Sequence, residues 1–158
     1  MLKKKPNASQ IINNDINRVC ARTGKLLFSL SNVNIGITGV SGFIGSSLAI
    51  YLVQISKLMD IDVKVYSIDR DDEKAYERVS LLNKDVANEI NYVKHDIKEE
   101  LVKMPELNII VHAASPARPS IFSEDPIGTI ESNCMGLDNI CSYLRGKAKA
   151  GVVYISTS

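Results

Sequence analysis

The sequence predicts an α/β domain with a doubly wound parallel sheet of about five strands, preceded by a helical N-terminal extension. From Val33 onward, short apolar runs alternate with longer mixed segments, as strands and helices do when they alternate along a chain. Three of the nine glycines fall between residues 39 and 45, directly after the first apolar run. The chain has 158 residues, of which 45% are hydrophobic, and this is enough for one compact core.

The N-terminal extension, residues 1–32, differs from the rest in charge. It carries six Lys or Arg against one Asp, whereas residues 33–158 carry thirteen against seventeen Asp or Glu. Its run from Lys3 to Lys5 can suggest membrane or nucleic-acid contact, but we interpret it as a solvated tail. From about 10 to 30 apolar residues recur at helical spacing and predict an amphipathic helix packed on the domain: Ile12, Ile16, Val19, Leu26, Leu27 and Leu30.

The alternating part supplies the elements of the sheet. Its apolar runs predict strands, and the mixed segments between them predict helices. The strands are expected at 33–38, 63–68, 90–94, 107–112 and 151–156. The helices are expected at about 43–58, 71–88 and 126–145, with a short helical turn near 98–103.

The third predicted helix has recognisable ends. Asp125 is a plausible N-cap, Pro126 follows at the first helical position, and Gly146 can end the helix. Cys134 and Cys141 lie seven residues apart on one face, so we expect both thiols to be small core residues. The apolar stripe of the same helix is expected to contain Ile130, Leu137 and Leu144.

Composition excludes several functions. Nineteen basic against eighteen acidic residues lack the excess that neutralises nucleic-acid phosphates, so no nucleic-acid partner is expected. Three cysteines without a C-x-x-C spacing predict neither a disulfide framework nor a metal site. There is no apolar run of membrane length and no signal peptide, so we expect a cytoplasmic protein with no membrane partner.

The glycine cluster carries the strongest chemical signal. It reads Thr38-Gly39-Val40-Ser41-Gly42-Phe43-Ile44-Gly45, between a predicted strand and a predicted helix. Gly39 can make the sharp turn, Gly42 can let the backbone approach a pyrophosphate, and Gly45 can let the helix pack on the strand. The helix amides can then bind the anion. The motif is one residue longer than the usual dinucleotide fingerprint and lacks the lysine of a P-loop. Its strand and helix flanks favour a Rossmann-type site over a mere tight turn.

Two carboxylates follow later strands of the predicted sheet. Asp69 ends the second strand, thirty residues after Gly39, where a carboxylate accepts hydrogen bonds from the adenosine ribose. Asp96-Ile97 follows the third strand at the same carboxyl edge. An aspartate at a strand end is often only a turn former, and it is the glycine motif that favours the functional interpretation.

With these residues in place, the chain resembles the N-terminal half of an extended short-chain dehydrogenase/reductase, in the NAD-dependent epimerase/dehydratase family that modifies nucleotide sugars. The resemblance runs from about Val33 to Ser158. Besides the glycine motif and the two aspartates, it is carried by His112-Ala113-Ala114-Ser115, by Asn133, and by Tyr154-Ile155-Ser156-Thr157-Ser158.

The resemblance implies NAD as cofactor and a role for each matched position. The loop residues Gly39, Ser41, Gly42, Phe43, Ile44 and Gly45 would hold the pyrophosphate. Asp69 with Arg70 would face the adenosine ribose, and Asp96 and Ile97 would face the adenine. Ala113, Ala114, Ser115 and Asn133 would line the central and nicotinamide side, and Thr157 would bind the sugar hydroxyl that is oxidised.

Within the family, the loop from Ala113 to Ser120 most resembles that of UDP-glucuronate decarboxylases. Arg118 in this loop can face a sugar carboxylate or phosphate, or simply be exposed. His112 closes an apolar strand and is interpreted as a structural hydrogen-bonding residue, not a general base, and His95 is expected at the surface.

The catalytic Tyr-x-x-x-Lys pair of the family follows the fifth strand, and no such segment follows it here. A string from Tyr143 to Lys147 precedes that strand and is interpreted as coincidence. We therefore expect an NAD-binding portion that is incomplete at its C-terminus and inactive alone, from an enzyme that acts on a nucleotide sugar and forms a homodimer when complete. The alternative is a non-catalytic dinucleotide-binding module, a sensor or scaffold; a methyltransferase is disfavoured by the Ser156-Thr157-Ser158 ending.

Overall fold

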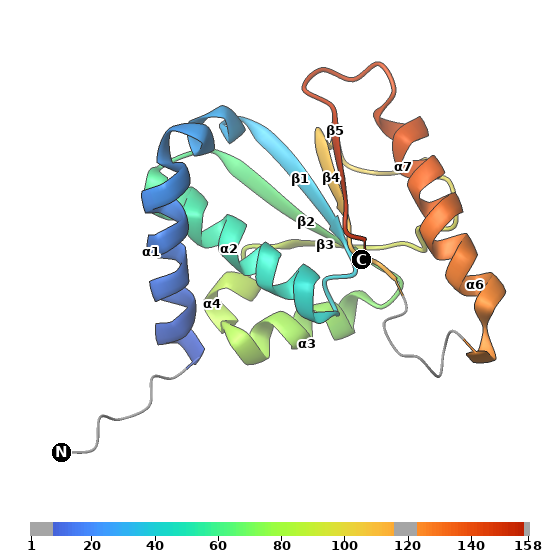
Figure 1. The fold of residues 1–158 in the computed structure, drawn as a ribbon, viewed down its shortest axis with the longest axis horizontal. Coiled ribbons are helices and arrows are strands. Elements are labelled where there is room, and N and C mark those ends of the chain that lie inside the picture. The colour runs from blue at the N-terminus through green and yellow to red at the C-terminus, as the bar shows by residue number, and fades with distance from the viewer. Residues whose placement is uncertain (1–7, 116–122, 157–158) are drawn as a thin grey trace.

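The computed structural model describes residues 8–115 and 123–156. Over these ranges the chain forms a parallel five-stranded sheet in the order β3-β2-β1-β4-β5 (Figure 1). Its strands are β1 (Val33–Thr38), β2 (Val63–Asp69), β3 (Asn91–Lys94), β4 (Ile109–His112) and β5 (Gly151–Tyr154). Every neighbouring pair is parallel. The predicted doubly wound sheet is therefore confirmed, and its carboxyl ends meet at one edge.

Helices cover the sheet from both sides. One side holds α2 (Phe43–Met59), α3 (Asp72–Leu82) and α4 (Lys84–Ala87). The other holds α6 (Pro126–Ile130), the π-helical turn η2 (Glu131–Met135) and α7 (Gly136–Leu144), drawn in orange at the right of Figure 1. Within the described ranges, none of the helices is long and apolar enough to cross a lipid bilayer.

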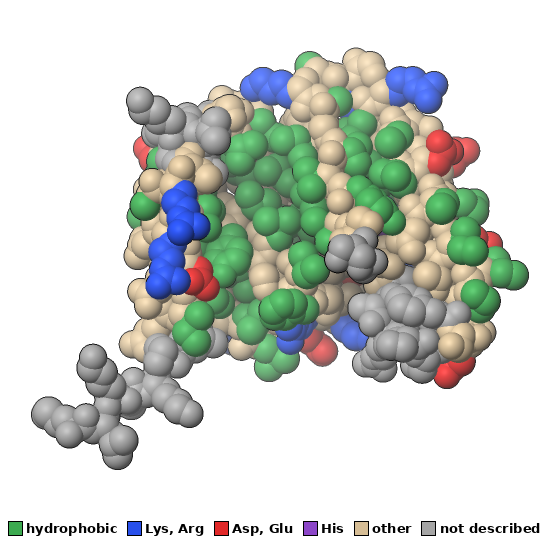
Figure 2. All heavy atoms as spheres, in the orientation of Figure 1, with side chains coloured by type: hydrophobic (Ala, Val, Ile, Leu, Met, Phe, Trp, Pro, Cys, Tyr) green, Lys and Arg blue, Asp and Glu red, His purple; other side chains and the backbone are tan. Residues whose placement is uncertain are grey.

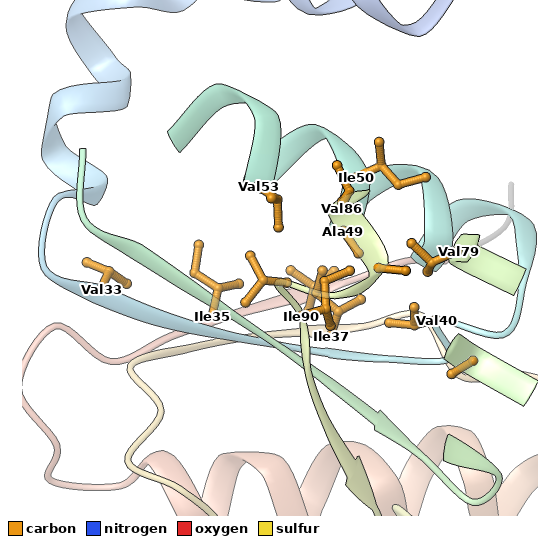
Figure 3. Packing of buried hydrophobic residues seen from close by; sticks show 14 residues of the cluster. Val33, Ile35, Ile37, Val40, Ala49, Ile50, Val53, Val79, Val86 and Ile90 are labelled. Atoms are coloured by element: carbon orange, nitrogen blue, oxygen red, sulfur yellow. The ribbon is translucent and has the colours of Figure 1, made fainter. Parts of the chain in front are cut away.

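The larger core lies between β1 and the helix that follows it. Val33, Ile35 and Ile37 alternate along β1, so all three project to the same side of the sheet. There they join Ala49, Ile50 and Val53 of α2 in one buried cluster (Figure 3). A second cluster on the opposite side includes Ile68, Ile110, Ile140 and Leu144. The sheet therefore holds the carboxyl edge rigidly between two apolar layers.

The N-terminal extension forms α1 (Ala8–Leu27) and the short 3-10 helix η1 (Phe28–Leu30). Ile16 of α1 is buried in a small cluster with Ile55 and Ile61, and Tyr51 donates a hydrogen bond to Asp15. The predicted amphipathic helix packed on the domain is confirmed, and α1 contacts α2 (Figure 1). Val19, expected on the apolar face, is 37% exposed.

Three predicted elements need correction. The helix expected over 71–88 is two helices, because Asn83 has an extended backbone and its side chain caps α4 by accepting from the Val86 amide. Residues 98–103 form turns and no helix. The fourth strand begins at Ile109, two residues later than expected. The Asn108 side chain before it accepts from the Asn34 amide and donates to the Ala148 carbonyl.

The third helix has the predicted ends, but its predicted buried face is wrong in part. Asp125 caps it by accepting from the Gly128 amide, Pro126 is the first residue, and Gly146 follows it with a positive φ. Cys134 and Cys141 are exposed, however, and Ile130 is 61% exposed. After the π-helical turn η2 the buried positions are Gly136, Ile140 and Leu144, so Leu144 of the predicted stripe is buried as expected.

Candidate functional site

The glycine loop joins the end of β1 to the start of α2. Gly39 has a φ of +76°, and a Cβ there would lie 2.8 Å from both the Ala113 carbonyl oxygen and the Ala114 Cα. A Cβ at Gly45 would overlap the Gly39 carbonyl oxygen and lie 2.9 Å from the Val40 Cα. Only glycine fits at these two positions without displacing backbone, so both serve the packing that the sequence predicted.

Gly42 differs from the other two glycines of the loop. It is the N-cap of α2 and has no side chain to cap the first turn. Among the described residues, a Cβ at Gly42 would come within 4 Å of one atom only, the Gly39 carbonyl oxygen at 3.2 Å. The side chains of Phe43 and Ile44 are exposed, which leaves the backbone amides of this turn as the groups that face an anion.

Asp69 at the end of β2 holds the loop in place. One carboxylate oxygen accepts from the Val40 amide at 2.8 Å and the Ser67 hydroxyl at 3.0 Å. The other accepts from the Ser41 hydroxyl at 2.9 Å and the Ser41 amide at 3.4 Å. These bonds occupy the four lone-pair positions of the carboxylate. A ribose hydroxyl therefore has to replace one of the present donors. Of the two side-chain donors, Ser41 lines the pocket whereas Ser67 is buried, so the Ser41 hydroxyl is the one that can rotate away for a ligand.

Burial raises the pKa of the Asp69 carboxyl above its usual value, and the hydrogen bonds from Ser41, Val40 and Ser67 partly oppose that rise. Because the folded-state pKa is raised, the free energy of unfolding falls as the pH rises through it and the buried carboxyl becomes charged. The four donors reduce this cost at neutral pH.

An open pocket of about 570 Å³ lies at the carboxyl edge of the sheet, a volume within the range of small-molecule sites. It is bordered by the glycine loop, the end of β2, the turn after β3 and the loop after β4. Ten of the predicted cofactor residues line it: Gly39, Ser41, Gly42, Asp69, Arg70, Asp96, Ile97, Ala113, Ala114 and Ser115.

Other predicted residues lie elsewhere. Phe43, Ile44 and Gly45 are in the first turn of α2 and do not line the pocket, and neither does Asn133, which is half-buried in η2. Thr157 and Arg118 fall outside the described residues. The position of the predicted sugar-binding hydroxyl is therefore still a sequence-based expectation.

Sequence reasoning missed several residues that line the pocket. Lys74 and Asp71 belong to the start of α3, where the Asp71 side chain accepts from the Lys74 amide. An N-cap aspartate two residues after the second strand was a usable signal, because it places the first turn of α3 at the carboxyl edge. The other missed lining residues include His95, Lys98, Asp125 and Ser132. His95, expected at the surface, is half-buried.

Two residues weighed as catalytic groups have structural contacts. His112 is buried and bonds the Thr38 hydroxyl at 2.8 Å and the Ser132 carbonyl at 3.0 Å. Tyr143 accepts from the Leu107 amide and donates to the Pro105 carbonyl, and Lys147 lies over its ring. Those partners precede β4, at the amino edge of the sheet opposite the glycine loop, which supports the view that this Tyr-x-x-x-Lys string is coincidental.

Fold and loop together define a Rossmann-type domain of the dinucleotide-binding class. Solved structures share this fold. Pen from Bacillus thuringiensis matches with a TM-score of 0.64 and 22% identity over 79% of this chain and 37% of its own. UDP-glucose-4-epimerase from Stenotrophomonas maltophila, solved with bound NAD and formylated UDP-arabinopyranose, matches with a TM-score of 0.60 and 20% identity, over 80% of this chain and 38% of its own.

The sequence comparison identifies the family. The model of the NAD dependent epimerase/dehydratase family matches residues 35–158, so the chain belongs to this family, whose cofactor is NAD. UDP-glucuronic acid decarboxylase 6 of Arabidopsis thaliana is 32% identical over 132 residues, which are 83% of this chain and 35% of that protein. Decarboxylase 5 of the same plant is 31% identical over 83% of this chain and 36% of its own length. The chain thus spans about a third of the length of these curated relatives.

Proposed function

We propose that the pocket at the carboxyl edge binds NAD, and that the chain is the NAD-binding portion of an enzyme that modifies a nucleotide sugar. One observation carries the proposal. The glycine loop, as far as Gly42 at the N-cap of α2, lines a pocket that also contains Asp69 and Asp96, as a dinucleotide requires. The residues fit the cofactor, because the space that a Cβ of Gly42 would occupy is free for a pyrophosphate.

Each part of the pocket has a function in this proposal. The first-turn amides of α2 bind the pyrophosphate. Asp69 accepts from the adenosine ribose once the Ser41 hydroxyl rotates away, and Asp96 and Ile97 face the adenine. Ala113, Ala114 and Ser115 line the path toward the nicotinamide, and Asn133 supports it from η2. The bound NAD supplies a hydride acceptor.

For the substrate we propose a UDP-sugar, with UDP-glucuronate as the first candidate. The support is the similarity to the Arabidopsis UDP-glucuronic acid decarboxylases. Thr157 would orient the hydroxyl that is oxidised, while a tyrosine base would come from a segment outside these 158 residues. We propose that a complete enzyme is cytoplasmic and homodimeric.

The direct test is a calorimetric titration of the chain with NAD, beside the variant Gly42→Val. The branched side chain would occupy the pyrophosphate space, so we expect binding to be abolished while the circular dichroism spectrum is retained. Gly151→Ala is the matched control, since its added Cβ would meet only an ordinary contact at 3.6 Å. If Gly42→Val binds NAD like the unsubstituted chain, the loop is only a turn and the proposal fails.

A non-catalytic dinucleotide-binding module is the second candidate, because NAD binding alone fits the described pocket equally well. Turnover assays with UDP-glucose, dTDP-glucose and UDP-glucuronate separate the two. We expect no turnover by the 158-residue chain, since neither Tyr143 nor His112 is positioned as a base, and general-base catalysis alone supplies a factor of about 10² to 10⁴. Turnover restored by adding the Tyr-x-x-x-Lys segment of a relative would support the enzyme over the module.

A further inference from the structure

A chain of hydrogen bonds runs through His112 from the loop after β4 to the π-helical turn η2. The Thr38 hydroxyl accepts from the Ala113 amide at 3.1 Å and from the Ala114 amide at 3.0 Å. Nδ1 of His112 lies 2.8 Å from the same hydroxyl, and Nε2 lies 3.0 Å from the Ser132 carbonyl oxygen. Thr38 and His112 are each no more than 1% exposed, so water does not substitute for these partners.

The network determines where the imidazole proton lies. A hydroxyl has two lone pairs and one hydrogen, and both lone pairs of Thr38 are engaged by the two amides. Its hydrogen therefore points to Nδ1 of His112, which must accept. Nε2 then carries the proton and donates to Ser132. The imidazole is neutral, and burial lowers its pKa in agreement with this assignment.

The π-helical turn frees the acceptor that His112 uses. In a regular α-helix the Gly136 amide would donate to the Ser132 carbonyl, four residues before it. Here it donates to the Glu131 carbonyl, five residues before it. Gly136 also admits the close approach, because a Cβ there would lie 3.2 Å from Nε2. The π turn therefore provides the free carbonyl oxygen to which His112 bonds.

Both ends of this hydrogen-bond network lie at the pocket. The residues at the ends, Ala113, Ala114 and Ser132, all line the pocket. Backbone atoms of Ala113 and Ala114 also sit where a Cβ of Gly39 would be, so a shift of the loop after β4 presses directly on the glycine loop.

We propose that His112 is a positioning residue for the dinucleotide pocket, which holds the loop after β4 in its binding position only while the imidazole is neutral. The proposal rests on the NAD pocket proposed above. Protonation would place a hydrogen on Nδ1 against the Thr38 hydroxyl hydrogen, and Thr38 could then accept from His112 only by releasing an alanine amide.

Within residues 8–115 and 123–156, the groups that contact the imidazole are uncharged. From β1 the Thr38 hydroxyl faces it, and from β5 the Tyr154 ring lies 5.5 Å away between centroids. From the helical side the facing groups are the Ser132 carbonyl and Gly136, while Glu131 is paired with Lys98 at 3.2 Å and Cys134 is exposed. Because the folded-state pKa is lowered from 6.5, binding should be strongest above that pH and be lost as the pH falls through the folded value.

The first experiment needs no cofactor. Nitrogen-15 NMR of the two histidines, with His95→Gln for assignment, should show His112 as the Nε2–H tautomer with a pKa below 6.5. The Ala113 and Ala114 amide shifts should follow the same titration. An Nδ1–H tautomer would overturn the proposal whether or not NAD binds, and so would alanine amide shifts that stay constant while His112 titrates.

The second experiment measures the NAD dissociation constant by calorimetry from pH 8 to pH 5. The unsubstituted chain should lose affinity as His112 is protonated, whereas His112→Gln, which keeps a donor for Ser132, should bind with a flatter pH profile. Thr38→Val should weaken binding about tenfold at pH 8 by leaving two half-buried amides unpaired, and Thr38→Ser should retain binding. Parallel profiles for His112→Gln and the unsubstituted chain refute the role of His112, while absent NAD binding by the unsubstituted chain refutes the pocket instead.

Discussion

The carboxyl edge around the glycine loop and the free edge at β5 are built from similar short apolar strands but differ in how completely they are packed. At the glycine loop, Gly39 and Gly45 sit against backbone atoms and Asp69 has four donors. At β5, Val152, Val153 and Tyr154 are between 38% and 49% exposed, and the strand ends the sheet of the described residues.

The difference shows which contacts are internal to this chain. The glycine loop is complete because its partners, β2 and the loop after β4, are present in the same domain. Among the residues that the structure describes, β5 pairs with β4 alone, so its apolar side chains contribute to an exposed hydrophobic area. Figure 2 shows such an area in the middle of the face between α1 and α7. Substitutions at the loop should therefore change folding and ligand affinity, whereas substitutions at β5 should change association.

The largest effect is expected for Gly45→Ala. Its Cβ would overlap the Gly39 carbonyl oxygen, which is backbone and cannot move aside without displacing the loop. We expect the free energy of unfolding to fall by about 3 kcal/mol, measured by urea denaturation. Gly151→Ala in β5 should change it by less than about 0.5 kcal/mol. Equal effects at the two glycines would contradict the contrast between the edges.

A smaller but still clear effect is expected in the choice of cofactor, with NAD bound more tightly than NADP. The 2′-phosphate would face the Asp69 carboxylate, and two charges about 4 Å apart repel by about 4 kcal/mol at an effective dielectric constant near 20. Arg70 and Lys74, which also line the pocket, reduce this repulsion. Calorimetry with both cofactors measures the balance, and Arg70→Ala should widen the preference. Equal or tighter NADP binding would show that the two cations outweigh Asp69.

At β5 we predict self-association of the 158-residue chain through the exposed strand. Light scattering coupled to size-exclusion chromatography should show species larger than a monomer, and Val153→Lys should shift them toward the monomer because a charged edge opposes pairing. Leu81→Lys is the control, since Leu81 is 84% exposed but lies on α3, away from β5. A monomeric unsubstituted chain would contradict the prediction.

The smallest effect is expected for Ser41→Ala. The variant loses the hydroxyl that occupies one lone pair of Asp69, and a ribose hydroxyl no longer has to displace it. We expect NAD affinity to rise by a factor of about 3, less than the worth of a full hydrogen bond because the Ser41 amide bond stays. Weaker binding by Ser41→Ala would show that the hydroxyl contacts the cofactor instead of competing with it.

The order of the elements and most of the site could be predicted from the sequence. The strands and the glycine motif were predictable because alternation and glycine spacing are local properties, and parallel strands bring their carboxyl ends to one edge without further information. Asp69 and Asp96 could be placed at the pocket for the same reason. The caps of the third helix, Asp125 and Gly146, were local as well.

Only the tertiary structure decided the features that depend on partners distant in the sequence. The π turn at 131–135 cannot be predicted from helical spacing, because its freed Ser132 carbonyl bonds to His112, twenty residues earlier. The exposure of Cys134 and Cys141 likewise became apparent only in the fold. Likewise, Asp69 was predictable as a strand-end carboxylate, but its four donors come from the folded loop and from Ser67. The spacing of residues along the sequence indicates which side chains share a face of a helix or strand. The atoms that those side chains contact depend on how distant segments pack together.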